Sequence, residues 1–348
     1  MWAAFSNNST MKTPSLVAHH IRISDTDHSF EAKPGQTLLD AALGEGLHLP
    51  YGCRSGTCGA CKATLVAGEV TYPFPPPALE NDCENALLCL AEAASDVEIA
   101  VREIRSDVDT PARLLPVRVV EKTLLAHDVM KLSLQLPRSE RLQYLAGQYV
   151  DIVLPGDKRR SFSLANAPHN DEQLELHIRK VPDGEFTTHV FETMRDKALM
   201  RINGPLGSFY LREDSQRPIL LVAGGTGYAP MQAIMQHTVA AEIERPITLF
   251  WGAKARHDLY AHDFIDEWEA EQSNFRYVPV LSEPMSDDHW KGRTGWVHEM
   301  VLAEYDDLSG FDVYLAGPPP MIKAATAAFL DHGLPDNQLW FDSFEYSR

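Results

Sequence analysis

The pattern of hydrophobic and polar positions changes character twice along the chain, which indicates three kinds of folded region. In the first, residues 21–24 and 97–101 alternate apolar and polar side chains, as half-buried strands do. Between them, residues 37–43 have the spacing of a short helix that glycines bring to an end. These elements predict a compact α+β unit over residues 17–104, which also holds the cysteines.

The second region, residues 114–215, is dominated by short strands. We expect these strands at residues 117–120, 130–134, 149–153 and 174–178. Short strands at roughly regular spacing are typical of an antiparallel barrel. The sequence therefore predicts an antiparallel β-barrel in this part of the chain.

From residue 218 the pattern changes again. Residues 218–223 form a continuous apolar run, as expected of a strand buried on both faces of a parallel sheet. Helical stretches then alternate with further apolar strands at residues 247–251, 277–281 and 313–316. Such alternation predicts an α/β domain with a doubly wound parallel sheet over residues 216–348.

Two polar, aperiodic segments flank the first folded region. Residues 1–16 are expected to be a disordered tail, and residues 105–113 are expected to be a linker. The predicted organisation is thus multidomain, with a cysteine-bearing unit followed by a barrel and an α/β domain.

Composition and charge exclude several functions. The 348 residues include 31 basic and 49 acidic side chains, giving a net charge of −18. Proteins that bind nucleic acid or anionic membranes gather basic residues, so we expect neither partner. No apolar run approaches the roughly 20 residues of a membrane helix, and five cysteines are too few for a disulfide scaffold. A monomeric, cytoplasmic protein is expected.

The cysteines carry the strongest chemical signal. Cys53, Cys58 and Cys61 lie within nine residues, and Cys89 follows at a distance. This is the plant-type [2Fe–2S] spacing, in which thiolates converge on a small cluster from a tightly wrapped loop. Structural zinc is the alternative, but zinc sites usually have two closely spaced pairs. Cys83 matches no ligand position.

A second signal lies in the predicted barrel. Arg160, Phe162, Ser163 and Leu164 stand in one short segment. A guanidinium can bind a pyrophosphate through two hydrogen bonds, an aromatic ring can pack on an isoalloxazine, and a serine hydroxyl can reach flavin N5. Alone the segment is a weak signal that favours an exposed hairpin, but further matches follow it. They are His177, Ile178 and Arg179, and then Gly184, Phe186 and Thr187 at the start of a helix.

A third signal lies in the α/β domain. Gly225, Thr226, Gly227 and Pro230 follow a buried strand and open a helix, as a dinucleotide-binding turn requires. Gly317, Pro318 and Met321 form a second turn after the strand at residues 313–316.

Three matches extend beyond single motifs and identify a family. Residues 50–62 resemble the ferredoxin cluster loop, residues 160–164 the flavin signature of the ferredoxin–NADP reductase superfamily, and residues 341–344 its C-terminal segment. Nearly the whole chain is similar to the reductase components of bacterial multicomponent oxygenases. The same arrangement occurs in the iron–sulfur flavoprotein reductase of CDP-6-deoxyhexose biosynthesis.

The resemblance implies a β-grasp ferredoxin domain, a barrel that binds FAD and a domain that binds NADH. It implies that Ser163 and Phe344 act at the flavin, that Phe344 covers the ring where nicotinamide stacks, and that Arg256 lies near the adenosine ribose. Lys254 and Arg256 leave NADPH open as the donor. Two positions depart from the family pattern, namely Ala316, where a cysteine is common, and Phe162, where tyrosine is commoner.

The implied activity is electron transfer from NADH through FAD and the cluster to a partner oxygenase. The alternative is a reductase that serves a dehydratase in deoxysugar synthesis. A non-catalytic electron carrier is disfavoured because the flavin and nicotinamide signatures are both complete.

Overall fold

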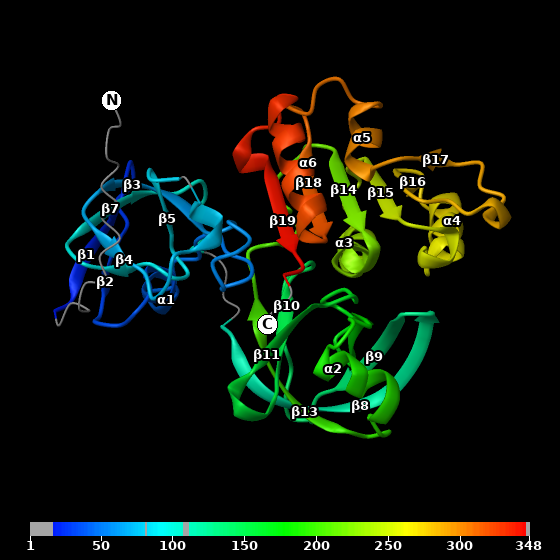
Figure 1. The fold of residues 1–348 in the computed structure, drawn as a ribbon, viewed down its shortest axis with the longest axis horizontal. Coiled ribbons are helices and arrows are strands. Elements are labelled where there is room, and N and C mark those ends of the chain that lie inside the picture. The colour runs from blue at the N-terminus through cyan, green and yellow to red at the C-terminus, as the bar shows by residue number, and fades with distance from the viewer. Residues whose placement is uncertain (1–16, 81, 107–110, 346–348) are drawn as a thin grey trace, which may run out of the picture. The chain divides into compact units, whose positions relative to one another are not determined.

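The computed structural model describes residues 17–80, 82–106 and 111–345. The tail expected at residues 1–16, and part of the linker expected at residues 105–113, lie outside these residues. The chain divides into two compact units, Met1–Asp109 and Thr110–Arg348 (Figure 1). Each unit has its own hydrophobic core.

The first unit is a twisted sheet with one helix against it. The sheet has the order β2-β1-β7-β3-β5, with β1 parallel to β7 and the other pairs antiparallel. Its strands are β1 (His19–Ile23), β2 (Ser29–Ala32), β3 (Lys62–Ala67), β5 (Asn85–Leu87) and β7 (Val97–Ala100). A two-stranded sheet joins β4 (Val70–Thr71) to β6 (Glu92–Ala93). Thr37 caps α1 (Leu38–Gly44) by accepting the N–H of Asp40.

The second unit begins with an antiparallel barrel. Its strand order is β11-β10-β13-β8-β9-β12, and a bridge between Leu164 and Leu176 joins the two ends. The strands are β8 (Arg113–Ala126), β9 (Val129–Gln135), β10 (Tyr149–Val153), β11 (Arg159–Ser163), β12 (Leu174–Arg179) and β13 (Leu199–Leu206). The short helix α2 (Glu185–Thr188) runs directly into a π-helical turn, η3 (His189–Thr193).

The rest of the second unit is a parallel sheet, in the order β17-β16-β15-β14-β18-β19. The strands are β14 (Ile219–Gly224), β15 (Ile247–Ala253), β16 (Phe275–Leu281), β17 (Arg293–Thr294), β18 (Asp312–Gly317) and β19 (Leu339–Ser343). The helices are α3 (Tyr228–Ala240), α4 (His262–Glu271), α5 (Val297–Leu302) and α6 (Pro319–Asp331). Short 3-10 turns complete the chain: η1 (Pro77–Leu79), η2 (Pro155–Asp157), η4 (Gly225–Gly227), η5 (Arg256–Asp258), η6 (Ser286–Asp288) and η7 (Asp336–Gln338).

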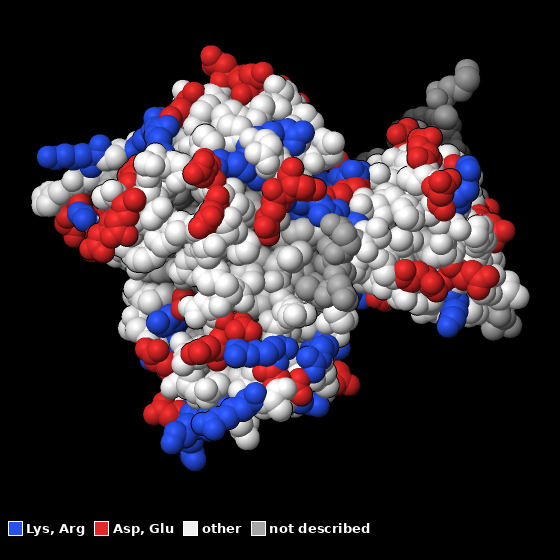
Figure 2. Space-filling view, turned by 180° about the vertical axis from the view of Figure 1, so that it is seen from behind, with Lys and Arg blue, Asp and Glu red and all other residues white. Residues whose placement is uncertain are grey.

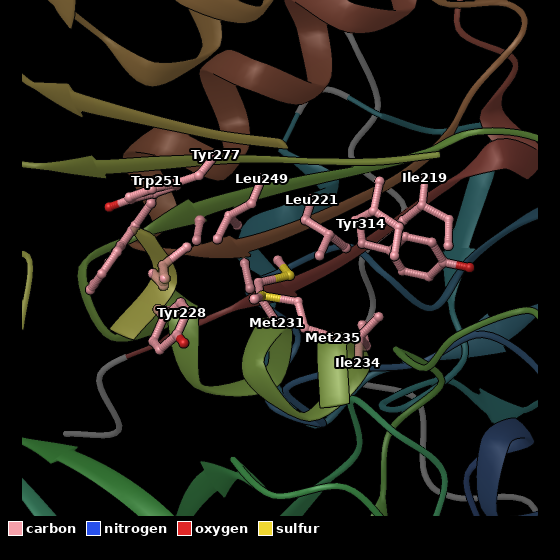
Figure 3. Close-up of a cluster of buried hydrophobic side chains, with 14 of the residues drawn as sticks. Ile219, Leu221, Tyr228, Met231, Ile234, Met235, Leu249, Trp251, Tyr277 and Tyr314 are labelled. Carbon is pink, nitrogen blue, oxygen red and sulfur yellow. The ribbon is translucent and has the colours of Figure 1, made fainter. Parts of the chain in front are cut away.

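Helices cover both faces of this sheet, so its strands are buried on each side. One face packs against α3 through residues such as Met231 and Met235 (Figure 3), and the other packs against α5 and α6. Strand β14 lies between β15 and β18. On one side the sheet continues through β15, β16 and β17, and on the other through β18 and β19, so the carboxyl end of β14 is a topological switch point. Ligands of open α/β sheets bind at such points. The fold class predicted from the sequence is confirmed.

Polar contacts join the barrel and the parallel sheet within the second unit. Gln232 on α3 donates to the carbonyl of Ala165 at 3.0 Å. Arg245, which precedes β15, donates to the carbonyl of Arg212 at 2.8 Å, and Asp312 on β18, within the parallel-sheet part, holds the same guanidinium. Because these groups are buried, breaking one would leave a partner unsatisfied. The barrel and the parallel sheet with its helices, the two lobes of this unit, are therefore held in a defined arrangement.

Charged side chains are scattered over the surface among uncharged ones (Figure 2). Figure 2 shows acidic and basic side chains interspersed on the face that it presents. Among the described residues, the helices are too short and too polar to span a bilayer.

Candidate redox site

The loop between α1 and β3 brings three cysteines together, and the chain after β5 supplies the fourth. Cys61 and Cys89 are buried and interact with each other, while Cys53 and Cys58 are half-buried and form a second pair. Cys83 is exposed on the same unit. The structure thus groups the four cysteines predicted as ligands.

The backbone of the loop turns its N–H groups toward sulfur. The amides of Ser55 and Cys58 each lie 3.4 Å from Cys53 Sγ, and the amide of Ala60 lies 3.5 Å from Cys58 Sγ. Gly56 has φ +78°, and a Cβ there would stand 2.3 Å from Leu90 Cδ1. Both the positive φ and the close approach favour glycine at this position.

Each pair of cysteines holds one thiol that ionises readily and one that does not. Hydrogen bonds from Cys58, Ser55 and Thr57 outweigh burial and lower the pKa of Cys53 to about 4, and a hydrogen bond from Cys61 lowers the pKa of Cys89. The same pairing, together with burial, raises the pKa of Cys58 and Cys61. Thiolates, rather than thiols, bind metal. Four sulfurs in two pairs, with amides directed at them, fit a [2Fe–2S] cluster.

The predicted flavin residues meet the end of the parallel sheet. Ser163, at the end of β11, donates from its hydroxyl to Asp342 Oδ2 at 2.8 Å. Phe344 follows β19, is half-buried and donates its N–H to the carbonyl of Gly317 at 3.0 Å. The two residues predicted to act at the flavin therefore lie on elements joined by direct contacts.

The other predicted flavin residues line the barrel nearby. The Phe162 and Phe186 rings are 5.6 Å apart, and Leu164 is fully buried. Arg160 is half-buried, and its guanidinium donates to the carbonyl of Arg159. Thr187 accepts the N–H of Val181 at 3.2 Å and donates to the carbonyl of Gly184, also at 3.2 Å. The Thr187 hydroxyl therefore links two backbone groups of the loop before α2.

Strand β12 divides its predicted residues between two environments. Ile178 lies in the barrel core, whereas His177 and Arg179 face the parallel-sheet lobe. The His177 ring is hydrogen-bonded through Nδ1 to the Tyr260 hydroxyl at 3.1 Å and through Nε2 to Glu175 Oε1 at 2.8 Å. Burial alone would raise the pKa of Glu175, but hydrogen bonds from His177 and Gln232 outweigh it and lower this pKa.

The two glycine turns pack on each other at the switch point. A Cβ at Gly227 would stand 2.0 Å from the carbonyl oxygen of Ala316. One at Gly224 would stand 2.5 Å from Met321 Sδ and 3.0 Å from Pro318 Cδ. The turn after β14 and the turn after β18 thus require glycine for their mutual contact. Thr226 and Pro230 are buried in and just after the first turn.

A guanidinium faces the first turn. Arg179 donates from Nε to Asp128 at 2.7 Å, and a Cβ added to Gly225, where φ is +55°, would stand 2.7 Å from Arg179 Nη1. A cation beside a glycine turn at the head of a helix fits a dinucleotide diphosphate. The residues present therefore fit the cofactors that the sequence predicted.

Arg256 lies in η5, farther along the same sheet edge. Its amide contacts Asp288 at 3.3 Å, and together with Tyr260 and Phe264 it lines a pocket at the start of α4. Lys254 lies 3.7 Å from Glu283. Arg256 thus lies on a different element from the Ser163–Asp342 hydrogen bond.

Two acidic residues of this site were not predicted from the sequence. Asp342 is bonded to Ser163, which lies 179 positions earlier, and Asp128 holds Arg179 across 51 positions. Asp342 stands between motif residues and could have been noticed. Asp128 lies in a hairpin turn, where acids are common, and gave no such signal.

Comparison with known proteins identifies the class first. Three family models match in order: a 2Fe-2S iron-sulfur cluster binding domain over residues 21–94, an oxidoreductase FAD-binding domain over 116–210, and an oxidoreductase NAD-binding domain over 221–327. The protein is thus an oxidoreductase with FAD, NADH and a [2Fe–2S] cluster as its cofactors.

Relatives over almost the full chain place it more closely. The CDP-6-deoxy-L-threo-D-glycero-4-hexulose-3-dehydrase reductase of Yersinia pestis is 38% identical over 331 residues, which cover 94% of this chain and 99% of the relative. Reductase component 2 of terephthalate 1,2-dioxygenase from Comamonas sp is 35% identical over 329 residues, with coverages of 94% and 97%. A solved cytochrome P450 reductase of Amycolatopsis superposes with TM-score 0.75 at 33% identity, covering 94% and 98% of the two chains.

The chain belongs to the family of iron–sulfur flavoprotein reductases that includes these proteins. It passes electrons from NADH through FAD and the [2Fe–2S] cluster. The family and function predicted from the sequence are confirmed at this level.

Proposed function

We propose that this reductase delivers single electrons to the oxygenase component of a multicomponent system. The observation that carries the proposal is the presence, on one chain, of a four-thiol site and of the Ser163–Asp342–Phe344 group at a dinucleotide switch point. When bound, FAD would supply the conversion of a two-electron hydride from NADH into single electrons, and a [2Fe–2S] cluster would supply one-electron transfer.

The chain contributes positioning at each stage. The turns after β14 and β18 would hold the nucleotide at the switch point, with Arg179, which faces the first turn, binding its diphosphate. Ser163, which is oriented by Asp342, would present its hydroxyl to the flavin, and Phe344 would cover the ring against which nicotinamide stacks. The loop at residues 53–61 and Cys89 would hold the cluster. Functional boundaries of 17–104, 114–215 and 216–348 follow from this assignment.

The oxygenase assignment draws on relatives that serve such systems. Besides the terephthalate dioxygenase component, the reductase component of phenol 2-monooxygenase from Pseudomonas sp. is 33% identical over 339 residues. A second candidate acceptor is a nucleotide-sugar dehydrase, which the 38% identity to the Yersinia reductase favours.

One coupled assay separates the two acceptors. NADH oxidation and product formation are followed with the holoenzyme plus either a purified oxygenase component or a CDP-hexulose dehydrase with its sugar nucleotide. Product formed only with the oxygenase supports the first candidate, and product formed only with the dehydrase overturns it. Size-exclusion chromatography with light scattering, and cell fractionation, test the expected monomer and its expected cytoplasmic location.

A further inference from the structure

A cluster of two histidines and an aspartate lies outside the site described above. His127 stands in the turn between β8 and β9 of the barrel, and His257 and Asp258 lie in η5 of the other lobe. Asp258 Oδ1 is 3.9 Å from His127 Nδ1 and 3.5 Å from His257 Nε2. The two imidazole centroids are 4.9 Å apart.

The facing atoms are available for a ligand. Asp258 is 8% exposed, and its Oδ2 accepts the N–H of Ala255, which leaves Oδ1 directed at the histidines. His127 and His257 are 58% and 51% exposed, so their rings can turn without disturbing a core. Within the described residues, neither imidazole makes a hydrogen bond at normal distance.

A second carboxylate stands behind the cluster. His127 Nε2, the nitrogen turned away from Asp258, lies 3.9 Å from Asp128 Oδ1. That oxygen is buried and has no hydrogen-bond partner within the described residues, while Oδ2 of the same group is held by Arg179. Histidines that bind metal characteristically donate their other N–H to such a carboxylate, which fixes the ring and raises its basicity.

We propose that His127, His257 and Asp258 form a binding site for a divalent transition-metal ion such as Zn²⁺, with Asp128 orienting His127. Zinc bonds of 2.0–2.1 Å in a tetrahedron separate neighbouring ligand atoms by about 3.3 Å. The separations of 3.5 and 3.9 Å reach this value through small rotations of exposed rings. Imidazole ligands select zinc, copper or nickel over magnesium and calcium, and water takes the fourth position.

The ion would tie two lobes of the same unit together. One ligand comes from the first hairpin of the barrel, and two come from the residues directly after Arg256. The segment assigned to the adenosine ribose is thereby fixed to the barrel when metal is bound. This role is separate from electron transfer and does not depend on which protein accepts the electrons.

The test is calorimetric titration of the holoenzyme with ZnCl₂ after dialysis against a mild chelator. We expect one Zn²⁺ ion to bind per chain. His127→Gln and His257→Gln should each weaken it by at least about tenfold, because lost ligands cost more than lost outer partners. His332→Gln, a change at an exposed histidine on the far end of α6, is the matched control and should bind as the parent does.

Two further readouts keep the result specific. The visible absorbance of the cluster must stay constant during titration, so that zinc taken up by Cys53, Cys58, Cys61 or Cys89 is recognised. The melting temperature should rise more with zinc in the parent and the control than in the two histidine variants. Equal zinc binding by all four proteins, or no stoichiometric binding by the parent, would overturn the proposal and leave only a surface His–Asp pairing.

Discussion

At the scale of single residues, the site depends on contacts between side chains that are distant in sequence. Ser163 and Asp342 lie on two lobes of the second unit and share a 2.8 Å hydrogen bond. A hydrogen bond with a charged acceptor holds the serine hydroxyl in one orientation. The barrel and the parallel sheet must therefore both be folded before this hydroxyl is aimed.

The cysteine grouping makes a prediction about the ligands. Replacing Cys53, Cys58, Cys61 or Cys89 with serine should abolish reduction of cytochrome c, because the cluster is lost, while flavin reduction by NADH continues. Cys83→Ser is the matched control, since Cys83 is exposed and outside the group. Visible absorbance, iron content and stopped-flow flavin reduction check each variant. Loss of the cluster in the Cys83 variant would contradict the assignment.

Phe344 makes a second prediction. Its backbone N–H is bonded to the Gly317 carbonyl, so the residue lies beside the turn after β18. Aromatic stacking is worth about 0.5–1.5 kcal/mol beyond buried area, so Phe344→Ala should change nucleotide discrimination by about 2- to 13-fold. Stopped-flow reduction with NADH and NADPH, together with a melting curve, measures this. A destabilised variant whose nucleotide ratio is unchanged would mean that Phe344 only packs.

The charges near Arg256 predict a preference for NADH. Glu283 lies 3.7 Å from Lys254, and Asp287 and Asp288 line the adjoining pocket. A 2′-phosphate would meet these acids, and exposed charge pairs are worth about 0.2–1 kcal/mol, so Glu283→Gln should raise kcat/KM for NADPH by up to about fivefold. Asp331→Asn, at the end of α6, should have no effect. A parent enzyme that prefers NADPH, and loses this preference in Arg256→Ala, would contradict the prediction.

At the scale of elements, glycine decides whether the two nucleotide turns can meet. Gly227→Ala places a Cβ 2.0 Å from the Ala316 carbonyl. Overpacking of this kind costs about 1–3 kcal/mol, so both the melting temperature and kcat/KM for NADH should fall. Gly310→Ala, where no atom lies within 4 Å of the added carbon, is the control. A Gly227→Ala enzyme as stable and active as the Gly310→Ala enzyme would show that the turns can separate without cost.

The sequence predicted the elements whose hydrophobic pattern is regular. The strand expected at residues 149–153 is β10, and the apolar run at 218–223 is β14, shifted by one residue. Strand β8 was expected only at 117–120, because its bulges opposite β9 break the alternation over Arg113–Ala126. The edge strand β2 was not predicted, although its four residues alternate between exposed and buried positions.

The hydrophobic pattern of the sequence did not predict contacts between elements. The sequence indicated that His177 belongs to a strand, but not that its ring would meet Tyr260 on the other lobe. The approach of His127 to His257 likewise depends on how the barrel packs on the sheet. Motifs record local geometry, whereas these contacts are set by tertiary packing.

At the scale of the whole molecule, the redox centres are divided between two units. The first unit has a core built on Leu38, Leu87 and Ile99, and the cores of the second unit share no residue with it. A unit with its own core can fold independently. The flavin and nicotinamide elements all lie in the second unit, and the four cysteines all lie in the first.

This division predicts that the two half-reactions can be separated. Residues 110–348 expressed alone should bind FAD and reduce ferricyanide with NADH at close to the parent rate, because every element of the nucleotide and flavin site is retained. The same fragment should lose cytochrome c reduction, because the thiols that hold the cluster are absent. Adding residues 1–109 as a separate chain should restore part of that activity, and raising its concentration should restore more, since the covalent link only raises the local concentration of one unit near the other. Cytochrome c reduction by the fragment alone at the parent rate would mean that electrons leave directly from the flavin, and the ferredoxin unit would then need another role.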